Sequence, residues 1–260
     1  MSHVTFVSAG PGAADLITVR GARALAAAEV VLFDALTDPA LRELAPTALW
    51  IDVGKRGFCH STKQTAINAV LVKQALAHAR VVRLKGGDAS IFGRLEEELL
   101  ALAQAGIACD VVPGVSAALA AAAHTQRPLT RRGLGRSVSL TTAMNQDGEL
   151  QAQRTADTEV FYMAGQQLAR LSRKLLEAGW PADTLVSVVS RAGCVDALTS
   201  DVQVATLAAA ALLHQGRPTV VIVGAGAGPL QNFEDSKNTL NSGIESGLEL
   251  HPAKTPSPTD

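Results

Sequence analysis

Short apolar runs alternate with longer helical stretches along the first half of the chain, and this alternation constrains the fold most. The expected strands cover residues 3–8, 30–33, 49–53, 81–85 and 108–112. The expected helices cover residues 16–29, 39–45, 62–79 and 95–105. Parallel strands need crossover connections of this kind, which are usually helices. The pattern therefore predicts an α/β fold with a mostly parallel sheet and helices on both of its faces.

A second series of elements follows a turn-rich basic segment at residues 125–135. Its expected strands are 137–142, 159–163, 185–189, a hairpin strand around 197–201, and 219–223; its expected helices are 166–178 and 204–213, and a further helix is expected at 117–123, just before the basic segment. We therefore divide the chain into one α/β domain at 1–114 and another at 115–228. Residues 229–260 are rich in Asn, Ser, Gly, Pro and Thr and are expected to form a disordered tail.

Composition limits the classes of function. The 260 residues are 47% hydrophobic and carry a net charge of −1, which argues against a nucleic-acid-binding protein. Three cysteines lie far apart and fit neither a disulfide framework nor a zinc site, so we expect a reducing, cytoplasmic location. No apolar run reaches membrane-spanning length, and we expect neither a membrane segment nor a signal peptide.

The segment 81–94, with the sequence VVRLKGGDASIFGR, indicates a buried strand that ends abruptly in a glycine-rich loop. Adjacent glycines allow backbone conformations and close approaches that a Cβ atom would forbid. Ligands of open α/β sheets usually bind at the carboxyl ends of the strands. Gly86, Gly87 and Asp88 are therefore candidate ligand contacts, and an ordinary surface turn is the alternative.

Two other strand ends carry groups suited to acid–base chemistry. Asp34 follows the strand 30–33, where partial desolvation would favour a proton-accepting carboxylate. Lys55 follows the next strand and has an ammonium group that can donate a proton or hold a carboxylate. We expect both side chains to face one cleft, although a turn-capping Asp and a surface Lys would give the same pattern.

Three further segments offer weaker signals. Gly10-Pro11-Gly12 lies between a strand and a helix but lacks the third glycine of a dinucleotide fingerprint, so an NAD site is disfavoured. Ser116 lies at a strand-to-helix turn, where it is expected to cap the helix that follows. Met163 ends a later strand and either packs against a ligand or fills the core.

Taken in order, these motifs resemble the tetrapyrrole methylases over about residues 3–224. The resemblance rests on the following segments: Ala9-Gly10-Pro11-Gly12, Val53-Gly54-Lys55-Arg56, Val82-Arg83-Leu84-Lys85-Gly86-Gly87-Asp88, Ile91-Phe92-Gly93-Arg94, Val112-Pro113-Gly114-Val115-Ser116-Ala117 and Pro128-Leu129-Thr130. Each motif alone is weak, but their order along one chain is specific.

The resemblance implies two α/β domains with an active-site cleft between them, a homodimer, and S-adenosylmethionine as methyl donor, with S-adenosylhomocysteine as its product. It carries nine positions over as donor contacts: Pro11, Gly86, Gly87, Asp88, Ile91, Ser116, Ala117, Met163 and Ala192. It carries over Asp34 as proton acceptor and Lys55 as proton donor. The implied reaction methylates carbons 2 and 7 of uroporphyrinogen III and gives precorrin-2, on the routes to siroheme and cobalamin.

The implied substrate is polyacidic and needs cationic partners. Fork-shaped guanidinium groups suit carboxylates, so the candidate substrate contacts are Arg56, Arg131, Arg132 and Arg136. The donor carries the reactive group itself, so no metal is implied. The chain departs from the family pattern at Ala35, Met144 and Ser190. These departures leave two alternatives open, namely another precorrin as acceptor or a binding protein with impaired catalysis.

Overall fold

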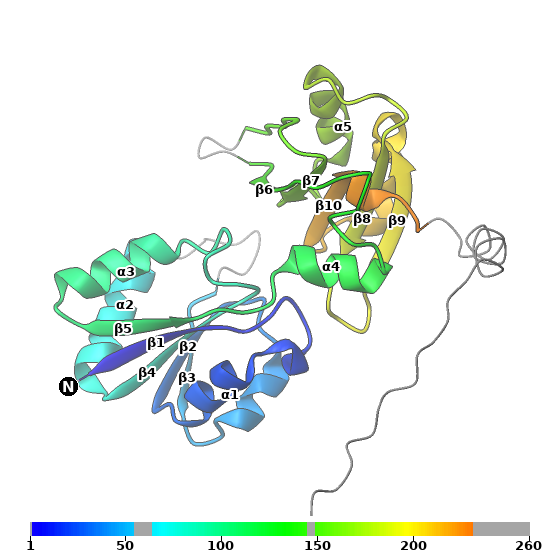
Figure 1. The fold of residues 1–260 in the computed structure, drawn as a ribbon. Coiled ribbons are helices and arrows are strands. Elements are labelled where there is room, and N and C mark those ends of the chain that lie inside the picture. Colours follow the sequence, from blue (N-terminus) through cyan, green and yellow to red (C-terminus); the bar gives the residue numbers. More distant parts are fainter. Residues whose placement is uncertain (1, 55–63, 145–148, 231–260) are drawn as a thin grey trace, which may run out of the picture. The chain divides into compact units, whose positions relative to one another are not determined.

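The computed structural model describes residues 2–54, 64–144 and 149–230. They form two five-stranded sheets, each with helical segments packed on both faces (Figure 1). Both sheets belong to one compact unit that ends at Gly228. The domain boundary that we expect between residues 114 and 115 falls between the two sheets and stays a prediction. The expected disordered tail lies, from residue 231 onward, outside the described residues.

The first sheet is entirely parallel, in the order β3-β2-β4-β1-β5. Its strands are β1 (His3–Ser8), β2 (Val30–Phe33), β3 (Leu49–Asp52), β4 (Arg80–Lys85) and β5 (Ala108–Val112). These spans confirm the expected strands to within a residue or two. Since all five strands run the same way, the residues that follow them meet at one edge of the sheet.

Helical segments cover both faces of this sheet (Figure 1). Their bounds are η1 (Ala14–Leu16), α1 (Val19–Ala26), η2 (Pro39–Leu44), α2 (Gln64–Ala77) and α3 (Leu95–Gln104). The helices α2 and α3 pack on one face, and α1 and η2 pack on the other. The segment expected as a helix at 39–45 is instead a 3-10 helix, capped by the Asp38 carboxylate on Ala40 N at 2.9 Å. Its six residues bury only Leu41, which gives too little packing for a longer helix.

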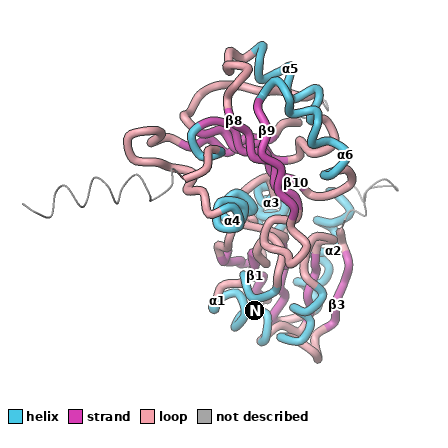
Figure 2. The backbone as a smooth tube through the Cα atoms, turned by 90° about the vertical axis from the view of Figure 1, so that its right-hand side faces the viewer, coloured by secondary structure: helices cyan, strands magenta, loops and turns pink. Residues whose placement is uncertain are grey.

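The second sheet is mixed, in the order β6-β7-β10-β8-β9. Its strands are β6 (Val138–Thr142), β7 (Thr158–Tyr162), β8 (Leu185–Ser190), β9 (Leu198–Gln203) and β10 (Thr219–Gly224). Only β6 and β7 pair in parallel, and the other neighbours are antiparallel. The antiparallel pair of β8 and β9 confirms the expected hairpin. In Figure 2 the strands of the two sheets form separate groups.

The second sheet is also covered on both faces. Its helical segments are α4 (Ala117–Thr125), α5 (Leu168–Glu177), η3 (Val204–Ala210), α6 (Ala211–His214) and η4 (Ala225–Ala227). The helix α4 packs on one face, and α5 and η3 pack on the other. The helix expected at 204–213 is mostly a 3-10 segment that ends in one α turn. No helix of the described residues is long and apolar enough to cross a bilayer.

Candidate functional site

A cavity of about 490 Å³ lies where the carboxyl ends of β2 and β4 face the start of α4 and the ends of β7 and β8. This volume lies within the usual range for small-molecule sites. The structure brings together there all nine residues expected to contact the methyl donor, together with the expected proton acceptor. They are Pro11, Asp34, Gly86, Gly87, Asp88, Ile91, Ser116, Ala117, Met163 and Ala192. Their roles remain predictions.

Glycine backbone forms one wall of the cavity. Gly10 and Gly87 exchange two backbone hydrogen bonds, of 2.7 and 3.2 Å, and Gly87 has a φ of +68° that favours glycine. A Cβ atom on Gly114 would lie 2.5 Å from the Ser8 Cβ and 3.3 Å from the Gly87 carbonyl oxygen. The loops after β1, β4 and β5 can therefore pack this closely only because glycines stand there. Such a cradle lets backbone donors and acceptors approach a ligand directly.

Asp88 joins two of these loops. Its Oδ2 accepts the backbone N–H of Gly114 at 2.8 Å, and its Oδ1 accepts the N–H of Ser90 at 2.8 Å and the Ser90 hydroxyl. Partial burial alone would raise the pKa of Asp88, but the hydrogen bonds from Gly114 and Ser90 outweigh it and lower that pKa. The half-buried carboxylate is therefore ionised at neutral pH and ties the Gly-Gly-Asp loop to the segment before α4.

Ser116 makes a different contact from the one expected. It occupies the N-cap position of α4, but its side chain accepts no capping hydrogen bond from the helix. Its hydroxyl instead lies 2.5 Å from the hydroxyl of Tyr162, which also accepts the backbone N–H of Ala118 at 3.2 Å. Tyr162 therefore does the capping and fixes the start of α4 against the end of β7. The Phe92 ring packs on Tyr162 with 5.1 Å between ring centroids.

A buried cluster of four charges forms another wall. Arg83 and Lys85 extend from β4, and both contact the Glu98 carboxylate of α3 at 3.0 Å. Arg83 Nη2 also donates to Asp34 Oδ1 at 2.6 Å. Sequence reasoning places Arg83 and Lys85 among the cations of the motif segments, but it gives them no separate role and does not predict their pairing with Glu98. The available signal was two cations inside an otherwise apolar buried strand, which requires a buried anion nearby.

The surroundings of the two cations shift their pKa values in opposite directions. Burial opposes the charge on Arg83, but Asp34 and Glu98 outweigh it and raise the pKa of Arg83. Burial and the neighbouring Arg83 charge lower the pKa of Lys85, although Glu98 and Asp34 oppose this shift.

Three of the four expected substrate arginines lie elsewhere. Arg131, Arg132 and Arg136 line a separate hollow beside Asp157. Arg131 donates to the carbonyl oxygens of Ala225 and Gly228, and these bonds hold it against the second sheet. The described cations that line the cavity are Arg83, Lys85, Arg94 and Arg191. Lys55 and Arg56 lie outside the described residues, so the pairing of Lys55 with Asp34 stays a prediction.

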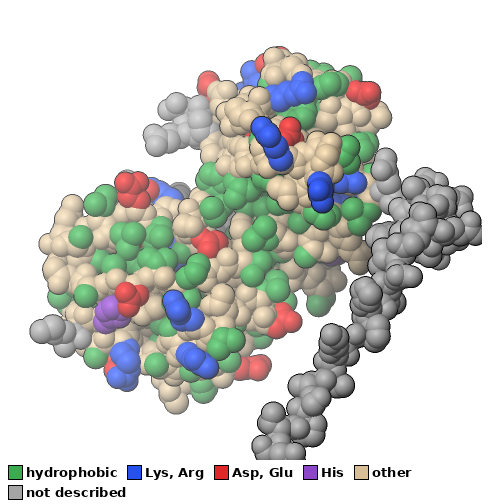
Figure 3. All heavy atoms as spheres, in the orientation of Figure 1, with side chains coloured by type: hydrophobic (Ala, Val, Ile, Leu, Met, Phe, Trp, Pro, Cys, Tyr) green, Lys and Arg blue, Asp and Glu red, His purple; other side chains and the backbone are tan. Residues whose placement is uncertain are grey.

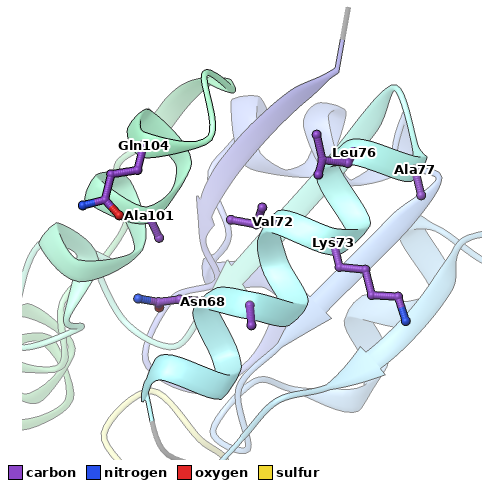
Figure 4. Close-up of a pocket in the computed structure, with 8 residues that line it drawn as sticks. Asn68, Val72, Lys73, Leu76, Ala77, Ala101 and Gln104 are labelled. Atoms are coloured by element: carbon purple, nitrogen blue, oxygen red, sulfur yellow. The ribbon is translucent and has the colours of Figure 1, made fainter.

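Other surfaces of the described residues offer less chemistry. A larger hollow of about 640 Å³ lies between α2 and α3, lined mostly by Ala, Val and Leu side chains with Lys73 as its one ionisable group (Figure 4). On the face drawn in Figure 3, Lys and Arg side chains are scattered and form no continuous patch. Within the described ranges, no group of three or more His, Cys, Asp or Glu side chains could hold a metal ion. The 490 Å³ cavity is therefore the candidate active site.

The fold and this site define a class of protein, the tetrapyrrole methylases. The family described as tetrapyrrole (corrin/porphyrin) methylases matches residues 3–211, and the chain belongs to it. The chain is 42% identical over 193 residues to a uroporphyrinogen-III C-methyltransferase of Pseudomonas aeruginosa, covering 73% of this chain and 79% of that protein. It is also 41% identical over 232 residues to siroheme synthase 1 of Yersinia pseudotuberculosis. That match covers 87% of this chain but only 48% of the relative, so the chain spans about half of the siroheme synthases.

Solved structures agree with this assignment. The uroporphyrin-III C-methyl transferase of Thermus thermophilus complexed with S-adenyl homocysteine is 32% identical, with a TM-score of 0.75 over 85% of this chain and 92% of that one. A cobalt precorrin-4 methyltransferase is 25% identical, with a TM-score of 0.76 over 87% of this chain and 96% of that one.

Proposed function

We propose that this chain is an S-adenosylmethionine-dependent C-methyltransferase that methylates uroporphyrinogen III at carbons 2 and 7 and so forms precorrin-2. The observation that carries the proposal is the convergence of nine expected donor contacts and Asp34 on one cavity, from six segments that are far apart in sequence. The likeness to uroporphyrinogen-III C-methyltransferases supports the choice of acceptor.

The cavity suits the donor. Its volume fits a nucleoside with an amino-acid arm, and its glycine-lined wall presents backbone groups without side chains in the way. The bound donor supplies an electrophilic methyl group on a sulfonium. The chain's own residues then hold donor and acceptor in line, and orientation of this kind is worth several kcal/mol or more of the barrier.

Asp34 is placed to accept a proton from the macrocycle. Its side chain is 30% exposed and lines the cavity, while Arg83 holds its Oδ1. A fixed carboxylate at the rim can take up the proton that the methylated ring must lose. Lys55 stays the proposed proton donor. Arg94 and Arg191 join the proposed substrate cations because both line the cavity, where a polyacidic ligand would meet them beside their present partners Glu97 and Asp196. The proposal also includes a homodimer and a cytoplasmic location.

The decisive experiment incubates the purified chain anaerobically with S-adenosylmethionine and uroporphyrinogen III and identifies the product by mass. We expect a dimethylated product with the absorbance of precorrin-2. Unmodified substrate, in a preparation that binds S-adenosylhomocysteine by calorimetry, would overturn the proposal.

The same assay with precorrin-2 as acceptor tests the second candidate, a later precorrin methyltransferase, which the likeness to the cobalt precorrin-4 enzyme favours. Donor binding without turnover on any tetrapyrrole tested, a precorrin-4 acceptor included, would indicate a binding protein. Light scattering coupled to gel filtration tests the homodimer.

A further inference from the structure

Glu98 has an environment unlike that of the other glutamates of its helix. It lies in the first turn of α3 with 1% of its surface exposed, whereas Glu96 and Glu97 are exposed. Four N–H groups reach its carboxylate. These are Arg83 Nε at 3.0 Å, Arg83 Nη2 at 3.1 Å, Lys85 Nζ at 3.0 Å and Gln64 Nε2 at 3.1 Å. A buried carboxylate with four donors, three of them on cations, is fixed in orientation.

The two hydrogen bonds from the Arg83 guanidinium to the Glu98 carboxylate determine where Arg83 points. With Nε and one Nη2 hydrogen on Glu98, Arg83 directs Nη1 to the carbonyl oxygens of Leu32 and Leu84, at 3.4 and 3.0 Å. Its remaining Nη2 hydrogen reaches Asp34 at 2.6 Å. A guanidinium group has five N–H donors, and all five are used here. The guanidinium therefore cannot rotate without breaking several bonds at once.

The cluster is also electrically balanced. The charges of Arg83 and Lys85 are matched by those of Glu98 and Asp34, and only Asp34 reaches the exposed side of the cavity. Without the Glu98 charge, two buried cations would share one carboxylate. Lys85 would then be drawn to Asp34 as well, and both carboxylate oxygens would be engaged by cations. A base held in this way is poorly placed to accept a proton from a ligand.

We propose that Glu98 is a positioning residue, which fixes Arg83 and neutralises Lys85 so that Asp34 keeps one oxygen directed at the substrate. This inference rests on the proposed function, because it needs Asp34 as the base. It does not place Glu98 in contact with the donor or the acceptor.

The test compares Glu98→Gln with three other variants. Glu98→Gln keeps the shape but removes the charge, and we expect kcat to fall roughly tenfold to a hundredfold because the base is displaced. The affinity for S-adenosylhomocysteine should stay within about threefold of that of the unchanged enzyme, since the substitution leaves the glycine-lined wall of the cavity as it is. Lys85→Met added to Glu98→Gln removes the surplus cation, and we expect most of kcat to return. The control is Glu96→Gln, because Glu96 is an exposed glutamate in the same helical turn. This variant also removes a negative charge from the start of the helix, and it should behave like the unchanged enzyme.

A second measurement does not depend on turnover. In protein labelled with nitrogen-15 arginine, the Arg83 Nε–H signal, assigned through its loss in Arg83→Lys, should exchange slowly with water. In Glu98→Gln it should exchange fast. If the unchanged enzyme does not methylate, the proposed function fails, and this signal alone decides whether Glu98 fixes Arg83.

Three results would overturn the proposal. The first is a Glu98→Gln enzyme with unchanged kcat. The second is a loss of kcat matched by an equal loss of donor affinity, which would make Glu98 a purely structural residue. The third is an Arg83 signal that stays protected in Glu98→Gln.

Discussion

Asp88→Ala should weaken donor binding by a predictable amount, because the Asp88 carboxylate joins two loops of the cavity wall. The substitution removes the hydrogen bond from Gly114 N at 2.8 Å and the two bonds from Ser90. Hydrogen bonds to a charged group contribute about 1.5–3 kcal/mol each. Only the Gly114 bond joins the two loops, since the Ser90 bonds lie within one loop.

The magnitude follows from the partial exposure of Asp88. Water can replace part of the lost bond, so we reduce this range to about 1–2 kcal/mol, which corresponds to roughly a 5- to 30-fold change in an equilibrium constant. The binding-competent loop arrangement then becomes less populated, and this raises the apparent dissociation constant by that factor at most; loss of the proposed direct contact of Asp88 with the donor would add to it. Asp88→Asn keeps one acceptor oxygen for Gly114 and should lose only the charge assistance, about 1 kcal/mol or roughly fivefold.

Calorimetry with S-adenosylhomocysteine measures both variants, with Asp183→Ala at an exposed position as control. The pH dependence checks the cause. The folded pKa of Asp88 is lowered, so its contribution is present above the unfolded value of about 3.9 and is lost as the pH falls through the lower folded value. The ratio of the donor affinity of the original protein to that of Asp88→Ala should therefore be constant from about pH 5 to pH 8. An Asp88→Ala protein with donor affinity within twofold of the original at neutral pH would refute the reasoning.

Three further outcomes are expected. Asp34→Asn should abolish product formation, followed by mass, while donor affinity measured by calorimetry stays near normal; a fully active variant would remove Asp34 from its role. Leu171→Ala removes a fully buried side chain from the core on α5 and should cost about 2–5 kcal/mol in chemical unfolding, and a cost well below 1 kcal/mol would contradict the packing. Burial and the nearby Arg217 charge lower the pKa of His214, so below about pH 6.5 the unfolded chain takes up a proton that the fold rejects. The melting temperature should therefore fall from pH 7 to pH 5, and it should fall less in His214→Gln. An equal fall in both proteins would contradict the role of His214.

The sequence predicts most of the first sheet and the glycine-lined wall of the cavity, and the reason is physical. β-Branched runs that end in glycine or a charged residue mark the carboxyl ends of buried parallel strands, and those ends must share one edge. That rule alone brings Asp34 and Gly86 into one cavity. The segments 39–45 and 204–213, expected as helices, are mostly 3-10 helix, and the spacing of apolar residues in short segments does not separate the two helix types.

Partners across elements could not be predicted in this way. The run Glu96-Glu97-Glu98 looks like a solvated first turn, and only the packing of α3 on the sheet selects Glu98 to meet Arg83. The arginines of the crossover segment were assigned to the substrate by charge alone. The bridge between Arg131 and Gly135 turns that segment toward its own hollow. Residue type predicts that a charge needs a partner, but tertiary structure decides which partner it has.

Backbone strain gives an independent argument that the cavity is what this fold maintains. Among the described residues, five that are not glycine have positive φ angles, between 51° and 60°. Gln126 ends α4, where that conformation is common, but Phe92, Arg94, Met163 and Arg191 all line the cavity. Each such residue costs of order 1–3 kcal/mol, and a glycine would relieve most of that cost. Glycine would adopt the same φ at a lower cost but would place no side chain in the cavity. We therefore infer that these positions keep their larger residues because the side chains line the cavity.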